Sequence, residues 1–254
     1  MKIKILILLF IFLLFPSVIA YPTPDHRWNF DEDGTDEFGG VDLTEQGGIS
    51  YSTTRIEGTH SAILDGSADY FSTASFTTGY TNYTFCTFVS VTDSNSQDTL
   101  FSENSGTESY VALRGDIGYA FQTRYPGNQD TQSETFGDDY FGVFQFICYQ
   151  LKSGAKGKWF VNGTPTGIVV DDAINIGTPN ANMNLGRQID NSVSYLLGLL
   201  DVTVIWLDQA VTPEDILELF NEIANPPAPP PTDEQKFTIT ATDTYDGSSL
   251  NNLT

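Results

Sequence analysis

The chain has 254 residues, of which 40% are hydrophobic and 13% aromatic, and its formal net charge is −22. This length and apolar content suffice for one domain of ordinary size with a buried core. A charge this negative repels nucleic-acid backbones and anionic membranes, so we exclude nucleic acid as a partner.

Residues 1–20 have the layout of a secretory signal peptide. Lys2 and Lys4 precede an unbroken apolar run, and small residues lead to a cut after Ala20. A membrane anchor is the alternative, but the run is short for a span. We predict cleavage, a secreted or cell-surface protein, and no membrane insertion of the mature chain. Loss of the two lysines would move the net charge from −22 to −24.

Residues 21–225 are rich in short β-type runs. Gly, Asn, Asp and Ser separate these runs, and helical periodicity is almost absent. Many short strands with turn signals between them predict an all-β sandwich or barrel. The expected strands include Ser61–Leu64, Tyr83–Val91, Tyr110–Leu113, Gly118–Thr123, Val143–Leu151, Trp159–Val161, Asn182–Leu185 and Leu199–Trp206.

The stretch Phe146–Gly163 (FICYQLKSGAKGKWFVNG) predicts a strand, a Gly- and Lys-rich turn, and a second strand. The second strand ends in Asn162 and Gly163. This pair favours a tight hairpin turn because both residues tolerate positive φ. Cys148 lies in this stretch, and Cys86 lies in another strand-like segment. In an oxidising compartment the two could form a disulfide; two free buried thiols are the alternative.

A single helix is predicted near the end of the domain. Thr212 suits the capping position, Pro213 suits the first helical position, and the helix ends at Asn225. We expect its apolar face to pack on the edge of the sandwich. That face consists of Ile216, Phe220 and Ile223.

The C-terminal part has a different composition. Residues 226–235 are rich in proline and predict a semi-rigid linker. Residues 236–254 begin with an alternating strand pattern but are too short for an independent domain. They are read as the start of a second β-module, as a strand that pairs with a neighbour, or as a tail.

Five segments follow one another in an order typical of a known superfamily. They are WNFDED (Trp28–Asp33), GTHSAILDGSADYF (Gly58–Phe71), YTFCTFVSV with DTLFS (Asp98–Ser102), WFVNG, and GLLDVTVIWLDQAVTPEDILELF (Gly198–Phe220). Together they resemble the concanavalin A-like lectin/glucanase superfamily, in its laminin-G-like and pentraxin-like branch. The resemblance implies a two-sheet antiparallel jelly-roll sandwich with one short C-terminal helix.

The resemblance also assigns the two cysteines. Pentraxins join a cysteine in a T-F-x-C strand to one just before the hairpin, and these positions correspond to Cys86 and Cys148. The chain departs from the pentraxin pattern by lacking a Trp between Cys148 and Ser153. We therefore expect the disulfide and the sandwich, but not membership of the true pentraxins.

A calcium site is a further implication of the resemblance. Domains of this branch often bind calcium with loop carboxylates and amides, and mixed oxygen ligands suit this hard ion. The corresponding segment here is LGRQIDNS (Leu185–Ser192), in which Arg187 and Ile189 replace polar positions. Ordinary solvated loop residues are the alternative. The predicted ligands are Glu103, Asn104, Glu108, Gln188 and Asp190.

Three tyrosines in loop-like sequence are candidates for exposed rings that stack on sugars: Tyr125, Tyr140 and Tyr195. Core packing is the alternative for each. Catalytic patterns are missing, since the chain has no E-x-D-x-x-E strand, no G-x-S-x-G elbow and no H-E-x-x-H zinc pair.

The first functional hypothesis is therefore a secreted, non-catalytic recognition module that binds carbohydrate or a glycosylated surface in adhesion. The second is a structural module of an extracellular or viral assembly, with protein partners or copies of itself as contacts. A glycoside hydrolase is a third, disfavoured hypothesis.

Overall fold

The structure is a computed structural model of the chain. It describes residues 21–74, 80–92, 97–104, 108–114, 120–125, 128–132, 141–152, 156–169, 182–189 and 194–226. Residues 104, 108–110, 114, 120–125, 128–132, 168 and 169 are described by their backbone alone. The predicted signal peptide, nearly all of the predicted linker and residues 236–254 lie outside the described residues and stay predictions.

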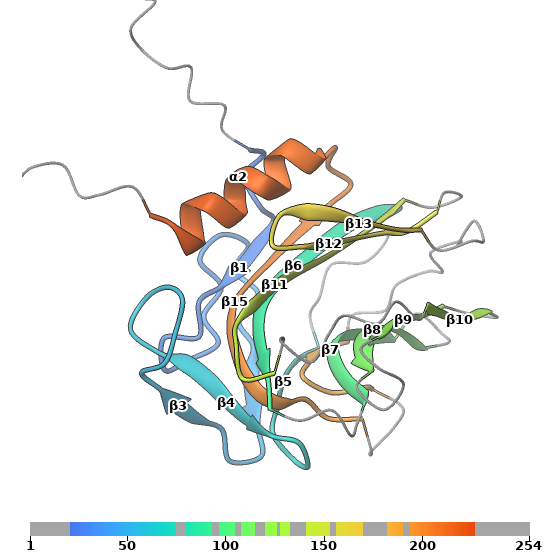
Figure 1. The fold of residues 1–254 in the computed structure, drawn as a ribbon. Helices are drawn as coiled ribbons and strands as arrows, with labels where there is room; N and C mark the ends of the chain where they lie inside the picture. The colour runs from blue at the N-terminus through green and yellow to red at the C-terminus, as the bar shows by residue number, and fades with distance from the viewer. Residues whose placement is uncertain are drawn as a thin grey trace, which may run out of the picture.

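Two antiparallel sheets face each other (Figure 1). Sheet A runs in the order β13 (Thr164–Val169), β12 (Lys158–Val161), β11 (Gln145–Lys152), β6 (Asn82–Val91), β15 (Leu197–Leu207), β4 (Ser61–Asp65) and β3 (Ser50–Ser52), and β1 (His26–Trp28) also pairs with β15. Sheet B runs in the order β10 (Asn128–Gln132), β9 (Ala120–Tyr125), β8 (Glu108–Arg114), β7 (Gln97–Asn104), β14 (Met183–Leu185), β5 (Tyr70–Thr73) and β2 (Thr44–Gln46). The predicted jelly-roll sandwich is confirmed.

The segment Trp28–Asp33, which by the resemblance corresponds to the superfamily's first strand, is a strand only at its start. Strand β1 ends at Trp28, because Phe30 and Glu32 have left-handed backbones with φ of 56° and 71°. This turn places the Phe30 ring in the core, 4.7 Å from the Phe71 ring between centroids. Burial of an aromatic ring thus offsets the cost of a backbone that non-glycine residues rarely adopt.

The space between the sheets is filled by apolar and aromatic side chains. Phe85 and Phe101 face each other from β6 and β7, with ring centroids 5.2 Å apart. Tyr149 and Trp159 lie side by side on β11 and β12, with centroids 4.7 Å apart. Most aromatic residues of the described chain are therefore core residues.

A second apolar cluster lies on the outer face of sheet A, under helix α2 (Pro213–Ala224). Alternate residues of β6 and β11 point outward here, among them Phe88 and Phe146. The expectation that the helix packs on an edge is wrong, because these outward side chains form an apolar surface on the sheet face. Ile216, Leu219 and Ile223 are the buried helix residues, whereas Phe220 is partly buried.

The predicted helix boundaries are confirmed. Thr212 accepts a hydrogen bond from the Asp215 amide at 3.2 Å, and the Asp215 carboxylate accepts one from the Thr212 amide at 2.7 Å. This capping box begins the helix at Pro213. Within the described residues, no helix has the length and apolar character that a membrane span requires.

The two cysteines lie directly opposite each other on β6 and β11. Their sulfur atoms are bonded, so the predicted disulfide between Cys86 and Cys148 is confirmed. The predicted hairpin is confirmed as well, since Asn162 and Gly163 join β12 to β13 with φ of 49° and 75°. Both features hold the β6, β11 and β12 strands in one register.

We expect the double substitution Cys86→Ala and Cys148→Ala to lower the free energy of unfolding. The bridge spans 62 residues of sequence, and closing a loop of this length contributes about 4 kcal/mol on the chain-entropy model. Urea unfolding of the variant and of the oxidised and reduced parent checks this. The reduced parent should match the variant, and equal unfolding free energies for all three samples would contradict the prediction.

Candidate functional site

A group of part-exposed aromatic rings lies at one end of sheet B. It consists of Tyr70 at the start of β5, and of Arg187 and Tyr195, which form a β-bridge just beyond β14. The Arg187 guanidinium carbon is 4.7 Å from the Tyr70 ring centroid and 5.4 Å from that of Tyr195. The two ring centroids are 6.2 Å apart. We call these three residues the Tyr–Arg–Tyr cluster.

The backbone around the cluster holds it in place. Gly186 follows β14 with φ of 84°, and a Cβ there would lie 2.5 Å from a methyl carbon of Leu64. Glycine therefore permits both the left-handed turn and the close approach. The Leu196 amide donates to the Gly186 carbonyl at 2.8 Å, and the Gln188 amide donates to the Ser194 carbonyl at 3.1 Å. These two backbone hydrogen bonds fix the positions of Arg187 and Tyr195 relative to each other.

The chemistry of the cluster suits a polyhydroxylated ligand. Tyrosine rings offer flat apolar faces, and the guanidinium group offers several N–H donors for hydroxyl oxygens. Attraction between the cation and the ring electrons holds the Arg187 head over the rings. Its Nε is buried and makes no hydrogen bond within the described residues. A preformed ring surface with fixed donors binds with little ordering cost.

The three tyrosines predicted to stack on sugars fare differently. Tyr195 belongs to the cluster and is part-exposed. Tyr125 lies in β9, where the backbone alone is described, and Tyr140 lies outside the described residues. Tyr70 and Arg187 were missed by the sequence reasoning. The available signal was Arg187 itself, a basic residue in a segment expected to be acidic.

The predicted calcium ligands do not come together among the described side chains. Glu103 is fully buried between the sheets, where Tyr80 donates a hydrogen bond to it. Gln188 is buried and accepts a hydrogen bond from Gln97 at 3.2 Å. The side chains of Asn104 and Glu108 and all of Asp190 lie outside the described parts. The described residues contain no group of three His, Cys, Asp or Glu suited to a metal.

Two buried carboxyl groups have raised pKa values. Burial raises the pKa of Glu103 to about 8 and that of Asp201 to about 6. The Asp201 carboxylate accepts hydrogen bonds from the amides of Ile56, Glu57 and Val202, and so anchors the segment before β4. Both side chains are inaccessible. A catalytic acid must reach its substrate, so these shifts reflect burial in the fold.

Comparison with known proteins agrees with this architecture. Residues 65–217, which are more than half of the chain, match a family model described as the concanavalin A-like lectin/glucanases superfamily. The chain belongs to this superfamily. No curated protein matches its sequence.

Solved structures of similar fold share little sequence with this superfamily member. Domain 4 of AbnA, a GH43 extracellular arabinanase from Geobacillus stearothermophilus solved with arabinotriose, is 16% identical with a TM-score of 0.60. The match covers 79% of this chain and 99% of that domain. The binding domain of botulinum neurotoxin serotype G is 9% identical, with a TM-score of 0.60, over 78% of this chain and 50% of the toxin domain.

A third similar structure is the binding domain of Paraclostridial Mosquitocidal Protein 1. It is 13% identical with a TM-score of 0.58, and the match covers 78% of this chain and 52% of that one. The chain therefore spans about half the length of the two toxin domains and nearly all of the arabinanase domain. At these identities the likeness shows the shared fold alone.

We expect Glu103→Gln to change how stability depends on pH. The pKa of Glu103 is about 8 in the folded chain against an ordinary value of 4.5. Between these values the folded state holds a proton that the unfolded state has lost. The parent's free energy of unfolding therefore falls as pH rises, by up to about 1.4 kcal/mol per pH unit. Glutamine stays neutral, so this loss should disappear.

Urea unfolding of both proteins at pH 5, 6.5 and 8 measures the effect. The advantage of the variant over the parent should grow across this series. Glu214→Gln, which removes an exposed carboxylate on α2, is the control and should follow the parent. Parallel pH profiles for Glu103→Gln and the parent would show that Glu103 titrates normally.

Proposed function

We propose that the domain is a non-catalytic carbohydrate-recognition module of a secreted or cell-surface protein, and that it serves adhesion to carbohydrate or glycoprotein surfaces. The observation that carries this proposal is the Tyr–Arg–Tyr cluster, which combines part-exposed rings with a fixed guanidinium group. Membership of a superfamily that contains lectins and glucanases supports it.

The comparisons favour recognition over hydrolysis. One structure of similar fold is domain 4 of an extracellular arabinanase in complex with arabinotriose, and others are binding domains of a botulinum neurotoxin and of a mosquitocidal protein. The two buried acids whose pKa values are raised furthest, Glu103 and Asp201, are closed to solvent. A retaining or inverting mechanism needs two carboxyl groups that flank a bound glycosidic bond.

The proposed binding mode places a sugar ring on the Tyr–Arg–Tyr cluster. The apolar face of the sugar would pack on Tyr195 and Tyr70, and its hydroxyl groups would accept hydrogen bonds from Arg187. Calcium is a proposed accessory ion held by the segment around Asp190. The alternative function is a structural module whose rims contact other protein chains.

A glycan array with the chain from residue 21, run with and without calcium, tests the function. We expect reproducible binding to one class of glycan. Silence across the array, together with a stable oligomer in solution, would favour the structural alternative. Release of sugar from β-glucans would instead indicate hydrolysis.

Substitution of Tyr195 tests the location. We expect Tyr195→Ala to weaken binding of the selected glycan about tenfold, which corresponds to about 1.4 kcal/mol, because a stacking surface is lost. The matched control is Phe38→Ala, since the Phe38 ring is 52% exposed and lies far from Tyr195 in sequence. Binding that is lost in the Phe38 variant and kept in the Tyr195 variant would place the site elsewhere.

A further inference from the structure

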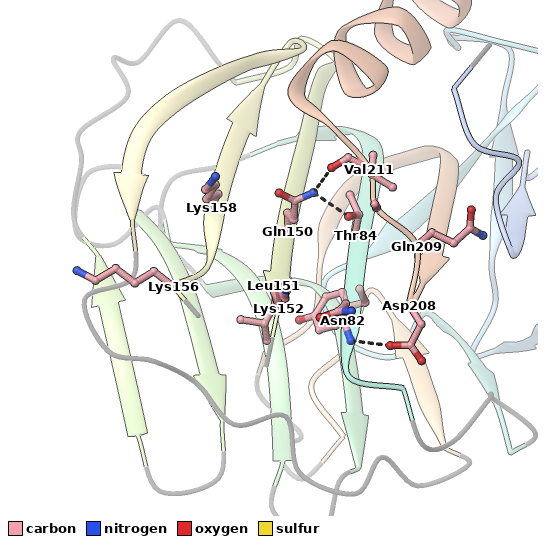
Figure 2. Close-up of a pocket in the computed structure, with 12 residues that line it drawn as sticks. Asn82, Thr84, Gln150, Leu151, Lys152, Lys156, Lys158, Asp208, Gln209 and Val211 are labelled. Carbon is pink, nitrogen blue, oxygen red and sulfur yellow. Dashed lines mark hydrogen bonds between the residues drawn. The ribbon is translucent and has the colours of Figure 1, made fainter. Parts of the chain in front are cut away.

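A polar pocket opens on the outer face of sheet A, beside the first turn of α2. Its volume is about 310 Å³. Figure 2 shows its floor on β6 and β11, with Thr84 and Gln150 pointing into it. The segment that joins β15 to α2 forms one wall, and Lys156 and Lys158, just before and on β12, form the other.

The register of sheet A explains why the pocket is polar. Cys86 and Cys148 form the row of outward side chains that the helix covers. Two residues further along, the outward row contains Thr84, Gln150 and Lys158 on three neighbouring strands, while on β15 it continues with Trp206 of the apolar cluster. On β6, β11 and β12 the outer face therefore changes from apolar to polar at the position where the helical cover begins.

The floor is held by hydrogen bonds. The Gln150 side-chain amide donates to the Val211 carbonyl at 2.7 Å and to the Thr84 hydroxyl at 3.3 Å. These bonds tie the floor to the segment that leads into α2 (Figure 2). The carbonyl oxygen of Gln150 and the hydroxyl hydrogen of Thr84 can still bond to a ligand. The pocket is thus a prepared polar surface.

Positive charge gathers around this pocket. Three of the eight lysines and arginines between residues 21 and 226 line it: Lys152, Lys156 and Lys158. Lys152 and Lys158 are exposed and form no ion pair with any described residue. The chain has a net charge of −22, yet neither of these two ammonium groups is paired with an acid among the described residues.

One carboxylate also lines the pocket and has to be weighed against the lysines. The Oδ1 atom of Asp208 accepts hydrogen bonds from the Thr81 amide at 2.7 Å, the Thr81 hydroxyl at 2.9 Å and the Asn82 amide at 3.0 Å. These donors lower the pKa of Asp208. The Asp208 carboxylate is therefore held by the residues at the start of β6. The three lysines and this one carboxylate leave the lining of the pocket with a net positive charge.

We propose that this pocket binds a small, hydroxylated acid, with the acid group between Lys152 and Lys158 and the hydroxyl groups on Thr84 and Gln150. The volume is at the low end of the range for ligand pockets, which suits a molecule of monosaccharide size. This inference is independent of the proposed function, because the pocket and the Tyr–Arg–Tyr cluster belong to different sheets.

The net charge limits the ligand further. At physiological salt, charges are screened beyond about 8 Å, so a small anion in the pocket interacts mainly with the lysines. An extended polyanion would also reach beyond the pocket and would be repelled by a chain whose net charge is −22. The structure therefore favours an acid with one or two charges over a charged polymer.

Calorimetric titration of the chain from residue 21 with glucuronate, glucose and inorganic phosphate tests the proposal. We expect glucuronate to bind more tightly than glucose, and added salt to weaken its binding. The double variant Lys152→Gln, Lys158→Gln should bind glucuronate about tenfold more weakly, because both charges that attract the acid group are removed. The matched variant Lys152→Arg, Lys158→Arg keeps both charges and should retain binding.

Amide chemical shifts identify the site. Glucuronate should shift the signals of Thr84 and Gln150 in the parent protein and not in the double Gln variant. Phosphate that binds and shifts the same signals supports an acid subsite that does not require the sugar. Absence of binding by both acids, or glucuronate binding that the double Gln variant retains, would overturn the proposal. Both lysines are exposed, so equal melting temperatures should show that the variants fold.

Discussion

Strands β6 and β11 are buried on both faces, and this double burial determines where the molecule can be open. Every residue of β6 from Tyr83 to Val91 is buried. Alternate side chains enter the space between the sheets, while Cys86 and Phe88 on the other face belong to the cluster under α2. Strands of this kind read as nearly continuous apolar runs. Their ends are the places where the outward row becomes polar.

The disulfide lies at this boundary. Cys86 and Cys148 belong to the covered apolar cluster, and the next outward row, with Thr84 and Gln150, is the floor of the pocket. The chain must leave β15, cross this floor and cap the helix at Thr212 before it can cover the sheet. The crossing segment therefore becomes a wall of the pocket. The buried apolar cluster, the position of the helix cap and the pocket all follow from the pairing of β6 with β11 and β15.

The fold was largely predictable because its signals are local or pairwise. Runs of β-type residues between turn signals mark the long strands, Asn162-Gly163 marks the hairpin, and Thr212 marks the start of the helix. The packing of α2 was harder to predict, because the outward apolar row exists only once β6 and β11 are paired. Phe30 was misassigned for a similar reason, since its left-handed backbone is stabilised by a ring contact with Phe71.

The candidate sites depend on contacts between residues that are distant in sequence, and they were less predictable. Tyr195 was identified from loop-like composition, but its partners Tyr70 and Arg187 come from another strand and another turn. The resemblance assigned Glu103 to a calcium site, as part of a second ligand set near the loop before Tyr110. Its strand pairing with Met183 instead directs it into the core. Register decides which face a side chain occupies, and register is a property of the folded sheets.

The few positive charges of this acidic chain have distinct roles. Arg27 is paired with Glu37 at 3.3 Å and with Glu57, so it neutralises acids within the fold. Arg187 is held over two aromatic rings, which leaves its donors next to an apolar surface. Two lysines at the pocket, Lys152 and Lys158, have no ion pair within the described chain. A lysine without an ion pair keeps its attraction for an external anion. For this reason the proposed pocket is the place where charge would select a ligand.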